Sequence, residues 1–409
     1  MGSRADGHAG WITFMLQWLS EQPYVSDFLA RLADHPSVQS AIVYFTGSQE
    51  ISPSALLGTL LALLGSWLFL ASYVSKFRLM AWGMWYMVAS SDKKTRPANN
   101  HHVDYAACQR KKIVFIRHGE SEWNLVFNKG FGPMFLVRLV KALINELAML
   151  FIQDSIFFDS PLSALGRQQA WDLLAFLGSQ KEGCLEPGCA SRPAGELSVP
   201  DLVAIIRGDA GKSIVVSSNL KRAISTGVLC LSSRLLKLHT PENKIHLMTS
   251  LQEISRNVDT LALTPANSLP RLPGSEASLR RMGGLMQYFY RNCLDRKLNS
   301  GNKPLKMKGK DRQDSFIRWV FSKDPKADAH QADLIIVCGH SLWFREFFKS
   351  FLPKDSTHVA KTTKMANCAC VAFDLYKSDD PSREVVRIAP ESIKVVYLGF
   401  EEKKKKGKK

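Results

Sequence analysis

The longest apolar stretch of the chain runs from residue 51 to residue 75 and contains no charged side chain. At about 1.5 Å per residue, a helix of this length covers the roughly 30 Å of a bilayer core. A buried core helix is the alternative. The missing charges and the aromatic and basic border from Tyr73 to Arg78 favour a membrane span. The next uncharged stretch, residues 79–91, is shorter, and it is predicted to be an interfacial segment or an extension of the first helix.

Short apolar runs alternate with helix-like patterns from about residue 106 to residue 400. Three runs are nearly continuous in apolar residues and end on polar ones, at 112–116, 213–216 and 334–338. Helices are predicted after two of these runs, at 219–237 and 341–352. Such strands joined by helices predict an α/β fold of three layers, α/β/α, with a mostly parallel central sheet, preceded by an N-terminal helical transmembrane region.

Three insertions interrupt this alternation, near residues 125–158, 181–211 and 263–330. The first contains an apolar stretch, residues 134–152, whose polar side chains recur at helical spacing. We expect a helix there that lies on a membrane or closes over the site. Three charges in this stretch argue against a second span. The basic, polar stretch 297–326 is predicted to be a mobile loop or cap.

The predicted organisation has five parts. These are an amphipathic helical segment, a transmembrane and interfacial region, a linker, an α/β domain and a polybasic tail, at residues 1–50, 51–91, 92–105, 106–400 and 401–409. The first segment is expected to pack on the membrane or on a protein partner. The tail is expected to bind anionic lipid.

Basic residues lie mainly on the C-terminal side of the apolar stretch. Arg31 is the only Lys or Arg in residues 31–50, whereas five follow the stretch, namely Lys76, Arg78, Lys93, Lys94 and Arg96. By the positive-inside rule, this bias predicts a single-pass protein with residues 106–400 in the cytosol. An endoplasmic reticulum or a mitochondrial membrane is expected.

The net charge of +17 favours anionic partners, which include phosphorylated substrates and acidic lipids. No helix-turn-helix, zinc-finger, RNP or KH pattern accompanies this charge, so we expect no nucleic-acid partner. The eight cysteines are scattered, and neither close pair has a second pair at zinc-finger spacing. They are expected to be reduced and mostly structural, with no metal site.

Cations and imidazoles follow the predicted strands at the points where the strands end. Arg117 and His118 end the first apolar run, Arg222 lies one turn into the helix after the second, and His340 follows the third. In an open α/β sheet, ligands bind at the carboxyl ends of the strands, where helix N-termini present free N–H groups to anions. Two histidines and two arginines at such ends predict an anion site.

Five segments resemble the motifs of the histidine phosphatase superfamily, which includes the phosphoglycerate mutases. The segment Ile116-Arg117-His118-Gly119-Glu120 resembles its signature, and the other four matching segments begin at Asp159, Val216, Leu251 and Val337. The resemblance covers about residues 110–400 in the family's order. It implies a three-layer phosphoglycerate mutase-like fold and phosphoryl transfer through a phosphohistidine.

The resemblance also implies roles for individual residues. His118 is the expected nucleophile, and Arg117, Arg222 and His340 would bind the equatorial phosphate oxygens. Glu253 is the expected general acid, although order along the chain alone selects it over other carboxylates. Gly119, Asn124 and Ser341 are expected to contact substrate, with helix capping as the alternative for Asn124. Glu120 and Glu122 are expected to cap the following helix or line the rim. No metal or cofactor is expected.

The mutases of the family follow their acid with a pattern that is absent here, since Glu253 is followed by Ile254-Ser255-Arg256-Asn257. A mutase excludes water, whereas a phosphatase admits it, so hydrolysis of a phosphate monoester is favoured. Two alternatives stay open: a mutase-type phosphotransferase, and a catalytically silent scaffold in a membrane complex.

Overall fold

The computed structural model describes residues 53–93, 104–149, 154–180, 197–237, 243–277, 283–378 and 385–401. The predictions for residues 1–50, for most of the linker, for the polybasic tail after Glu401 and for the first close cysteine pair therefore lie outside the described residues. The six described cysteines are free thiols. The chain divides into two compact units, Met1–Leu79 and Met80–Lys409, and the boundary falls within one helix.

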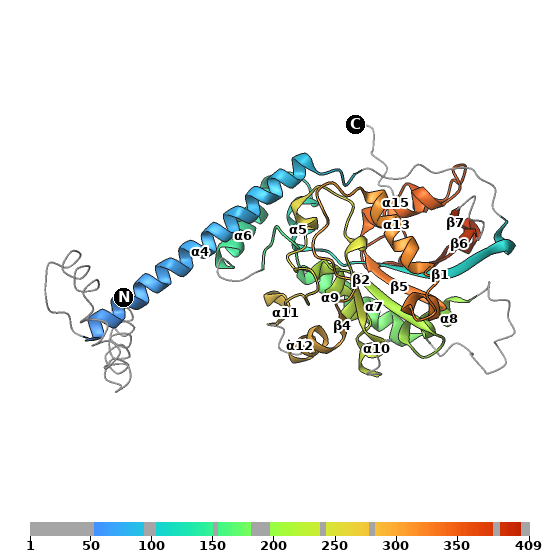
Figure 1. Cartoon of the computed structure of the whole chain (residues 1–409), viewed down its shortest axis with the longest axis horizontal. Helices are drawn as coiled ribbons and strands as arrows, with labels where there is room; N and C mark the ends of the chain where they lie inside the picture. Colours follow the sequence, from blue (N-terminus) through green and yellow to red (C-terminus); the bar gives the residue numbers. More distant parts are fainter. Residues whose placement is uncertain are drawn as a thin grey trace. The chain divides into compact units, whose positions relative to one another are not determined.

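Helices and strands alternate along most of the chain (Figure 1). The helices are α4 Pro53–Ala89, α5 Glu122–Phe127, α6 Pro133–Ala148, α7 Ala164–Ser179, α8 Val199–Arg207, α9 Lys221–Cys230, α10 Ser232–Lys237, α11 Gly274–Ala277, α12 Gly283–Asn292, α13 Gly309–Val320, α14 Asp328–Gln331 and α15 Ser341–Phe351. The strands are β1 Cys108–Arg117, β2 Ser213–Ser218, β3 Ile245–Met248, β4 Leu294–Asp295, β5 Leu334–Gly339, β6 Cys370–Ser378, β7 Val386–Ile388 and β8 Lys394–Tyr397.

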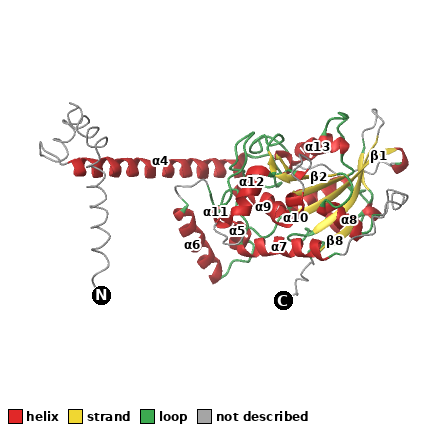
Figure 2. Ribbon diagram, turned by 90° about the horizontal axis from the view of Figure 1, so that it is seen from below, coloured by secondary structure: helices red, strands yellow, loops and turns green. Residues whose placement is uncertain are grey.

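The strands form one sheet in the order β4-β3-β2-β5-β1-β6-β7, with β8 also paired to β6. Strands β1 to β5 pair in parallel, and β6 runs antiparallel to β1. The sheet is therefore mostly parallel, as the near-continuous apolar runs predict. Figure 2 shows its strands with helices packed around them.

Alternate residues of the central strands enter two separate cores. Val114 and Ile116 face a core shared with α7, α8, α9, α10 and α12. Ile113 and Phe115 face the other core, where Phe115 stacks on Phe344 of α15 at 4.1 Å between ring centroids and α13 also packs. This period of two follows from the pleat of a strand. The three-layer α/β/α prediction is confirmed.

Helix α4 continues without a break to Ala89, so residues 79–89 extend the first helix, which is one of the two arrangements predicted for residues 79–91. Within the described residues, Leu57–Ala89 is long and apolar enough to cross a membrane by its length and composition, with a mean hydropathy of 1.8. None of its most apolar part is buried within the protein. In the second unit the end of this helix is packed, because Tyr86 is fully buried.

The prediction of a mobile loop or cap at 297–326 is wrong for Gly309–Val320, and the described part of the insertion at 181–211 also holds a helix. The basic stretch 297–326 contains α13, in which Phe316 and Arg312 are fully buried. The stretch 181–211 contains α8, which begins with a capping box between Ser198 and Asp201. The helix predicted at 219–237 forms but breaks at Leu231 into α9 and α10.

Candidate active site

The parallel strands β2, β5 and β1 are neighbours, so their carboxyl ends meet at one edge of the sheet. His118 follows β1 and His340 follows β5, and their ring centroids lie 5.0 Å apart. The backbone N–H of His118 donates to the Gly339 carbonyl at 3.0 Å, which fixes the two loops to each other. Ser218, the last residue of β2, bonds His340 at 2.8 Å. The predicted juxtaposition of the two histidines is present.

The loop after His118 is held by close backbone contact with α7. A Cβ atom on Gly119 would lie 2.4 Å from the Gly166 carbonyl oxygen, and one on Gly166 would lie 2.0 Å from the Glu120 carbonyl oxygen. Only glycine fits at either position. Ser163, the N-cap of α7, accepts the Gly166 N–H and donates to the Glu120 carboxylate at 2.8 Å. The two motifs that begin near His118 and Asp159 therefore interlock through their glycines.

The tautomer of His118 suits a nucleophile. Its Nδ1 lies 2.6 Å from the Gly119 carbonyl oxygen, and a carbonyl only accepts, so Nδ1 carries the proton. In the neutral ring the lone pair is then on Nε2. Burial, reinforced by Arg222 and Arg117, lowers the pKa of His118 well below its usual value. The ring is therefore neutral at physiological pH.

His340 is fully buried at the N-cap of α15. Its Nε2 is 2.8 Å from Ser218 Oγ, and its Nδ1 has no hydrogen-bond partner among the described residues. Burial, followed by the charge of Arg222, lowers the pKa of His340 well below the usual value. Without an anion in the site, this imidazole is neutral.

Glu253 caps the helix that follows His340. Its carboxylate accepts the N–H of Leu342 at 3.2 Å and that of Trp343 at 2.7 Å, both in the first turn of α15. The N–H of Ile254 donates to the same carboxylate at 3.0 Å. A carboxylate at a helix N-terminus is stabilised by these free donors. Glu253 thus fixes the first turn of α15, which begins directly after His340.

Arg222 lies in the first turn of α9, with 2% of its surface exposed. Its Nη1 donates to the Asp259 carbonyl at 2.7 Å, and its Nη2 lies 3.2 Å from Asp259 Oδ2. The start of α9 is set by Asp159, whose carboxylate accepts the N–H of Lys221 at 2.8 Å and that of Leu263 at 3.1 Å. The φ of Asp159 is 45°, in the left-handed region that favours glycine, so the turn is strained.

Asp259 is a candidate that the sequence analysis missed. It is buried, and its Oδ1 has no hydrogen-bond partner among the described residues. Burial raises the pKa of Asp259 to about 6 against the lowering effect of Arg222, and the charge of Glu253 adds to the rise. A carboxyl group with a pKa of about 6 beside a buried arginine suits general acid and base chemistry.

Arg117 is buried but turned toward the C-terminal segment. Its Nη1 donates to the Met365 carbonyl and lies 2.5 Å from Glu401 Oε1. Its Nε is buried without a hydrogen-bond partner among the described residues. The charge of Arg117 reaches His118, because it contributes to the lowered pKa of that ring.

The remaining predicted contacts lie around this cluster. Asn124 is in the first turn of α5, and its Oδ1 accepts from Asn128 at 2.8 Å. The N-cap of α5 is Ser121, so neither Glu120 nor Glu122 caps it. Ser341 is buried as the first residue of α15. No group of three His, Cys, Asp or Glu residues within the described ranges could hold a metal.

A buried ion cluster supports the loop that carries Glu253 and Asp259. Asp92, directly after α4, lies 2.8 Å from Lys303 Nζ and also pairs with Arg312. Lys303 in turn donates to the carbonyls of Glu253 at 2.7 Å and Ser255 at 2.8 Å. Burial lowers the pKa of Lys303 to about 8. Arg312 also donates to the Glu253 carbonyl at 3.3 Å, so Lys303 and Arg312 together hold this loop through its backbone.

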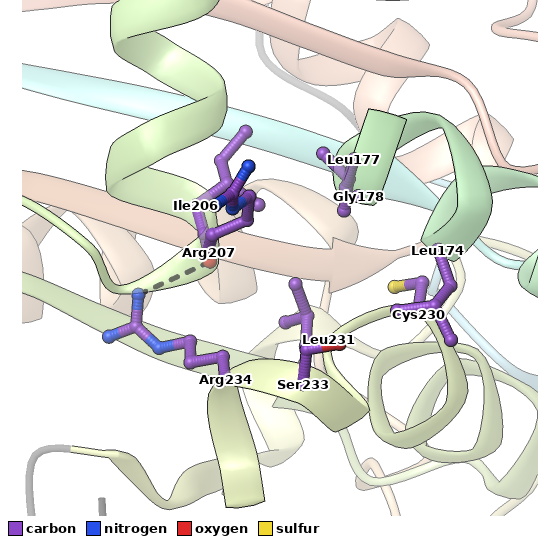
Figure 3. A pocket seen from close by; sticks show the side chains of 9 residues that line it. All are labelled: Leu174, Leu177, Gly178, Ile206, Arg207, Cys230, Leu231, Ser233 and Arg234. Atoms are coloured by element: carbon purple, nitrogen blue, oxygen red, sulfur yellow. Dashed lines mark hydrogen bonds between the residues drawn. The ribbon is translucent and has the colours of Figure 1, made fainter. Parts of the chain in front are cut away.

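A small apolar pocket lies elsewhere in the domain (Figure 3). It is lined by residues of α7, α8, α9 and α10, and Arg234 at its edge donates to the Ile206 carbonyl at 3.4 Å. None of the predicted site residues lines it.

No protein-family model matches this chain, and none of the curated proteins does. Among solved structures, a mycobacterial glucosyl-3-phosphoglycerate phosphatase is similar at 15% identity and a TM-score of 0.29, over 68% of this chain and 97% of that one. A phosphoserine phosphatase variant from Entamoeba histolytica is similar at 14% identity and a TM-score of 0.28, over 68% and 94%. Another, called mycobacterial hydrolase 2, has 14% identity and a TM-score of 0.31, over 72% and 94%. Similarity at this level does not assign a function, so the function is argued from the residues of the site.

Proposed function

We propose that this chain is a membrane-attached phosphatase that hydrolyses phosphate monoesters through a phosphohistidine on His118. The observation that carries this proposal is the neutral His118 ring, which has its free lone pair on Nε2 and lies next to His340. The charges of two buried arginines help to keep this ring neutral, because they lower its pKa. Phosphoryl transfer needs an in-line nucleophile and positive charge around three oxygens. This set of side chains can provide both.

In the proposed first step, His118 Nε2 attacks phosphorus and the bond from phosphorus to the ester oxygen breaks. Asp259 gives its proton to the leaving oxygen. In the second step, the Asp259 carboxylate takes a proton from water, whose oxygen attacks the phosphohistidine. The P–N bond breaks, which releases inorganic phosphate and restores His118 and the protonated Asp259. Arg222, Arg117 and His340 stabilise the charge on the equatorial oxygens, with the His340 ring protonated when the phosphate is bound beside it.

We assign the proton transfer to Asp259 rather than to Glu253 because of their hydrogen bonds. The Glu253 oxygens are engaged by three backbone N–H groups, whereas Asp259 Oδ1 has no hydrogen-bond partner among the described residues. Glu253 then acts as a positioning residue for α15 and His340.

Hydrolysis is expected to exceed isomerisation. The full chain, in detergent, should release inorganic phosphate from members of a panel of phosphate monoesters and phosphopeptides. With 3-phosphoglycerate and a bisphosphoglycerate primer, it should form negligible 2-phosphoglycerate, because the segment after Glu253 lacks the mutase pattern. Isomerisation at about ten per second, a common enzymatic rate, would contradict the proposal in favour of a mutase. No phosphate release from any compound would favour a silent scaffold.

We also propose a single span with the α/β unit in the cytosol, supported by the length of α4 and by the basic residues after it. In sealed microsomes and mitochondria, external protease should digest a C-terminal tag and leave an N-terminal tag intact. Alkaline carbonate should leave the protein in the membrane. Its complete release would show that α4 does not cross the bilayer.

A further inference from the structure

Helix α6 presents an apolar face that no described residue covers. At about 100° per residue, six of its large apolar side chains fall within an arc of roughly 120°. All six are exposed by 46% or more, namely Leu136, Val137, Val140, Leu143, Ile144 and Leu147. Phe131 and Met134, at the start of the helix, are exposed by 81% and 61%. We call this surface the α6 apolar face.

The opposite side of the same helix is packed. Phe135, Leu139 and Ala142 join a small core with α5 and with Ile156. The carboxylate of Glu146 accepts the Ile156 N–H at 2.7 Å. The helix is therefore fixed in orientation by its own domain, and the α6 apolar face points away from that contact. A contiguous apolar surface of this kind marks a site of contact with a membrane or another protein.

One edge of the α6 apolar face is cationic. Lys141 is exposed and follows the arc on one side, and Arg138 lies next to it around the helix, with its Nη2 bonded to the Gly130 carbonyl at 2.8 Å. Asn145 completes this polar flank. An apolar arc with cations along one edge is typical of a helix at a bilayer surface, where lysine reaches the head groups above its buried stem.

A second apolar surface of the same compact unit belongs to the end of α4. Trp82, Met84, Trp85, Met87 and Val88 are all exposed by 41% or more. They continue directly from the part of α4 that is long and apolar enough to cross a membrane. Tryptophans at such a position favour the head-group level. The side chains of both surfaces thus suit contact with a lipid bilayer.

We propose that the α6 apolar face lies on the surface of the lipid bilayer, as a second, non-spanning membrane contact of the α/β unit. This contact does not depend on the phosphatase activity proposed above. Because α5 packs on the other side of α6, this contact places α6 between the head groups and α5, the helix after the His118 loop. The unit is thereby held against the bilayer at two places, the end of α4 and the α6 apolar face.

Photo-crosslinking of the full chain tests this proposal. The protein, with benzoyl-phenylalanine at Val140 or at Ile144, is reconstituted into vesicles of phosphatidylcholine and phosphatidylserine that carry a trace of radiolabelled phosphatidylcholine. After illumination, we expect labelled lipid on both variants. The matched control has the same residue at Leu236 of α10, which is 47% exposed, and it should take up several-fold less lipid.

Two outcomes would overturn the proposal. One is lipid labelling at Val140 and Ile144 no greater than at Leu236. The other is a covalent dimer in place of the lipid adduct, which would make the α6 apolar face an interface between two copies. Both positions are exposed, so the substitutions should leave folding intact, and thermal unfolding of each variant checks this. A variant that unfolds early is replaced by one at Leu147 on the same face.

Discussion

Replacing His118 with alanine is expected to abolish the phosphoenzyme and to lower turnover of a phosphate monoester by about 10⁴-fold or more. The reason is that no other described side chain presents a neutral imidazole with a free Nε2 beside Arg222. The intermediate should be visible after a brief incubation with radiolabelled substrate as a phosphoprotein that is labile to acid and stable to base.

The matched control for this variant is His330→Ala. His330 is exposed in α14, and its Nδ1 bonds the Ser322 carbonyl on the surface at 3.0 Å. It should keep full activity and the phosphoenzyme. Full turnover by His118→Ala, or an acid-labile phosphoprotein that persists in it, would exclude the proposed nucleophile.

Replacing Asp259 with asparagine is expected to lower turnover of an alkyl phosphate by about 10²- to 10⁴-fold. With p-nitrophenyl phosphate the first step should change little, because nitrophenolate leaves without a proton. Asparagine keeps an oxygen for Arg222, so the cation stays in place. Pre-steady-state release of nitrophenolate, compared with steady-state turnover of the alkyl ester, separates the two steps.

The pH profile gives an independent check on Asp259. Its pKa is raised to about 6, so the acid form needed for the first step predominates below that pH. Wild-type turnover of the alkyl ester should therefore fall as pH rises through about 6, and this limb should be absent in Asp259→Asn. The opposite result would be that Glu253→Gln loses turnover of the alkyl ester but not of p-nitrophenyl phosphate, while Asp259→Asn shows no such difference. In that case Glu253, not Asp259, is the general acid.

The central strands could be predicted because their apolar runs are local and nearly continuous. The strand expected at 112–116 is longer in the structure, from Cys108 to Arg117. Its first half is polar, so the apolar pattern did not predict that part of the strand. Lys112 is buried there and lies 2.6 Å from Asp374 on the neighbouring strand β6. From sequence alone a charged residue such as Lys112 is predicted to lie on the surface, because its partner is distant along the chain.

The same limit explains the missed helix α13 and the missed candidate Asp259. Arg312 makes α13 look polar, yet it is fully buried because it pairs with Asp92, far away along the chain. Asp259 gains its environment from Arg222 and from burial, and neither appears in the spacing of residues 251–260. For α8, by contrast, a local signal was present, since Ser198 and Asp201 form a capping box.

The buried position of Asp92 bears on the modularity of this protein. Asp92 follows the membrane-type helix by only three residues, yet it supplies the negative charge for Lys303 and Arg312 under the loop of Glu253 and Asp259. A chain shortened to begin after this residue would leave two cations buried without that partner, which is a costly state in a protein interior. The end of α4 and the residues directly after it are thus a structural part of the α/β unit, not an exchangeable linker. A shortened chain that keeps the α/β unit intact would have to retain residues 80–93.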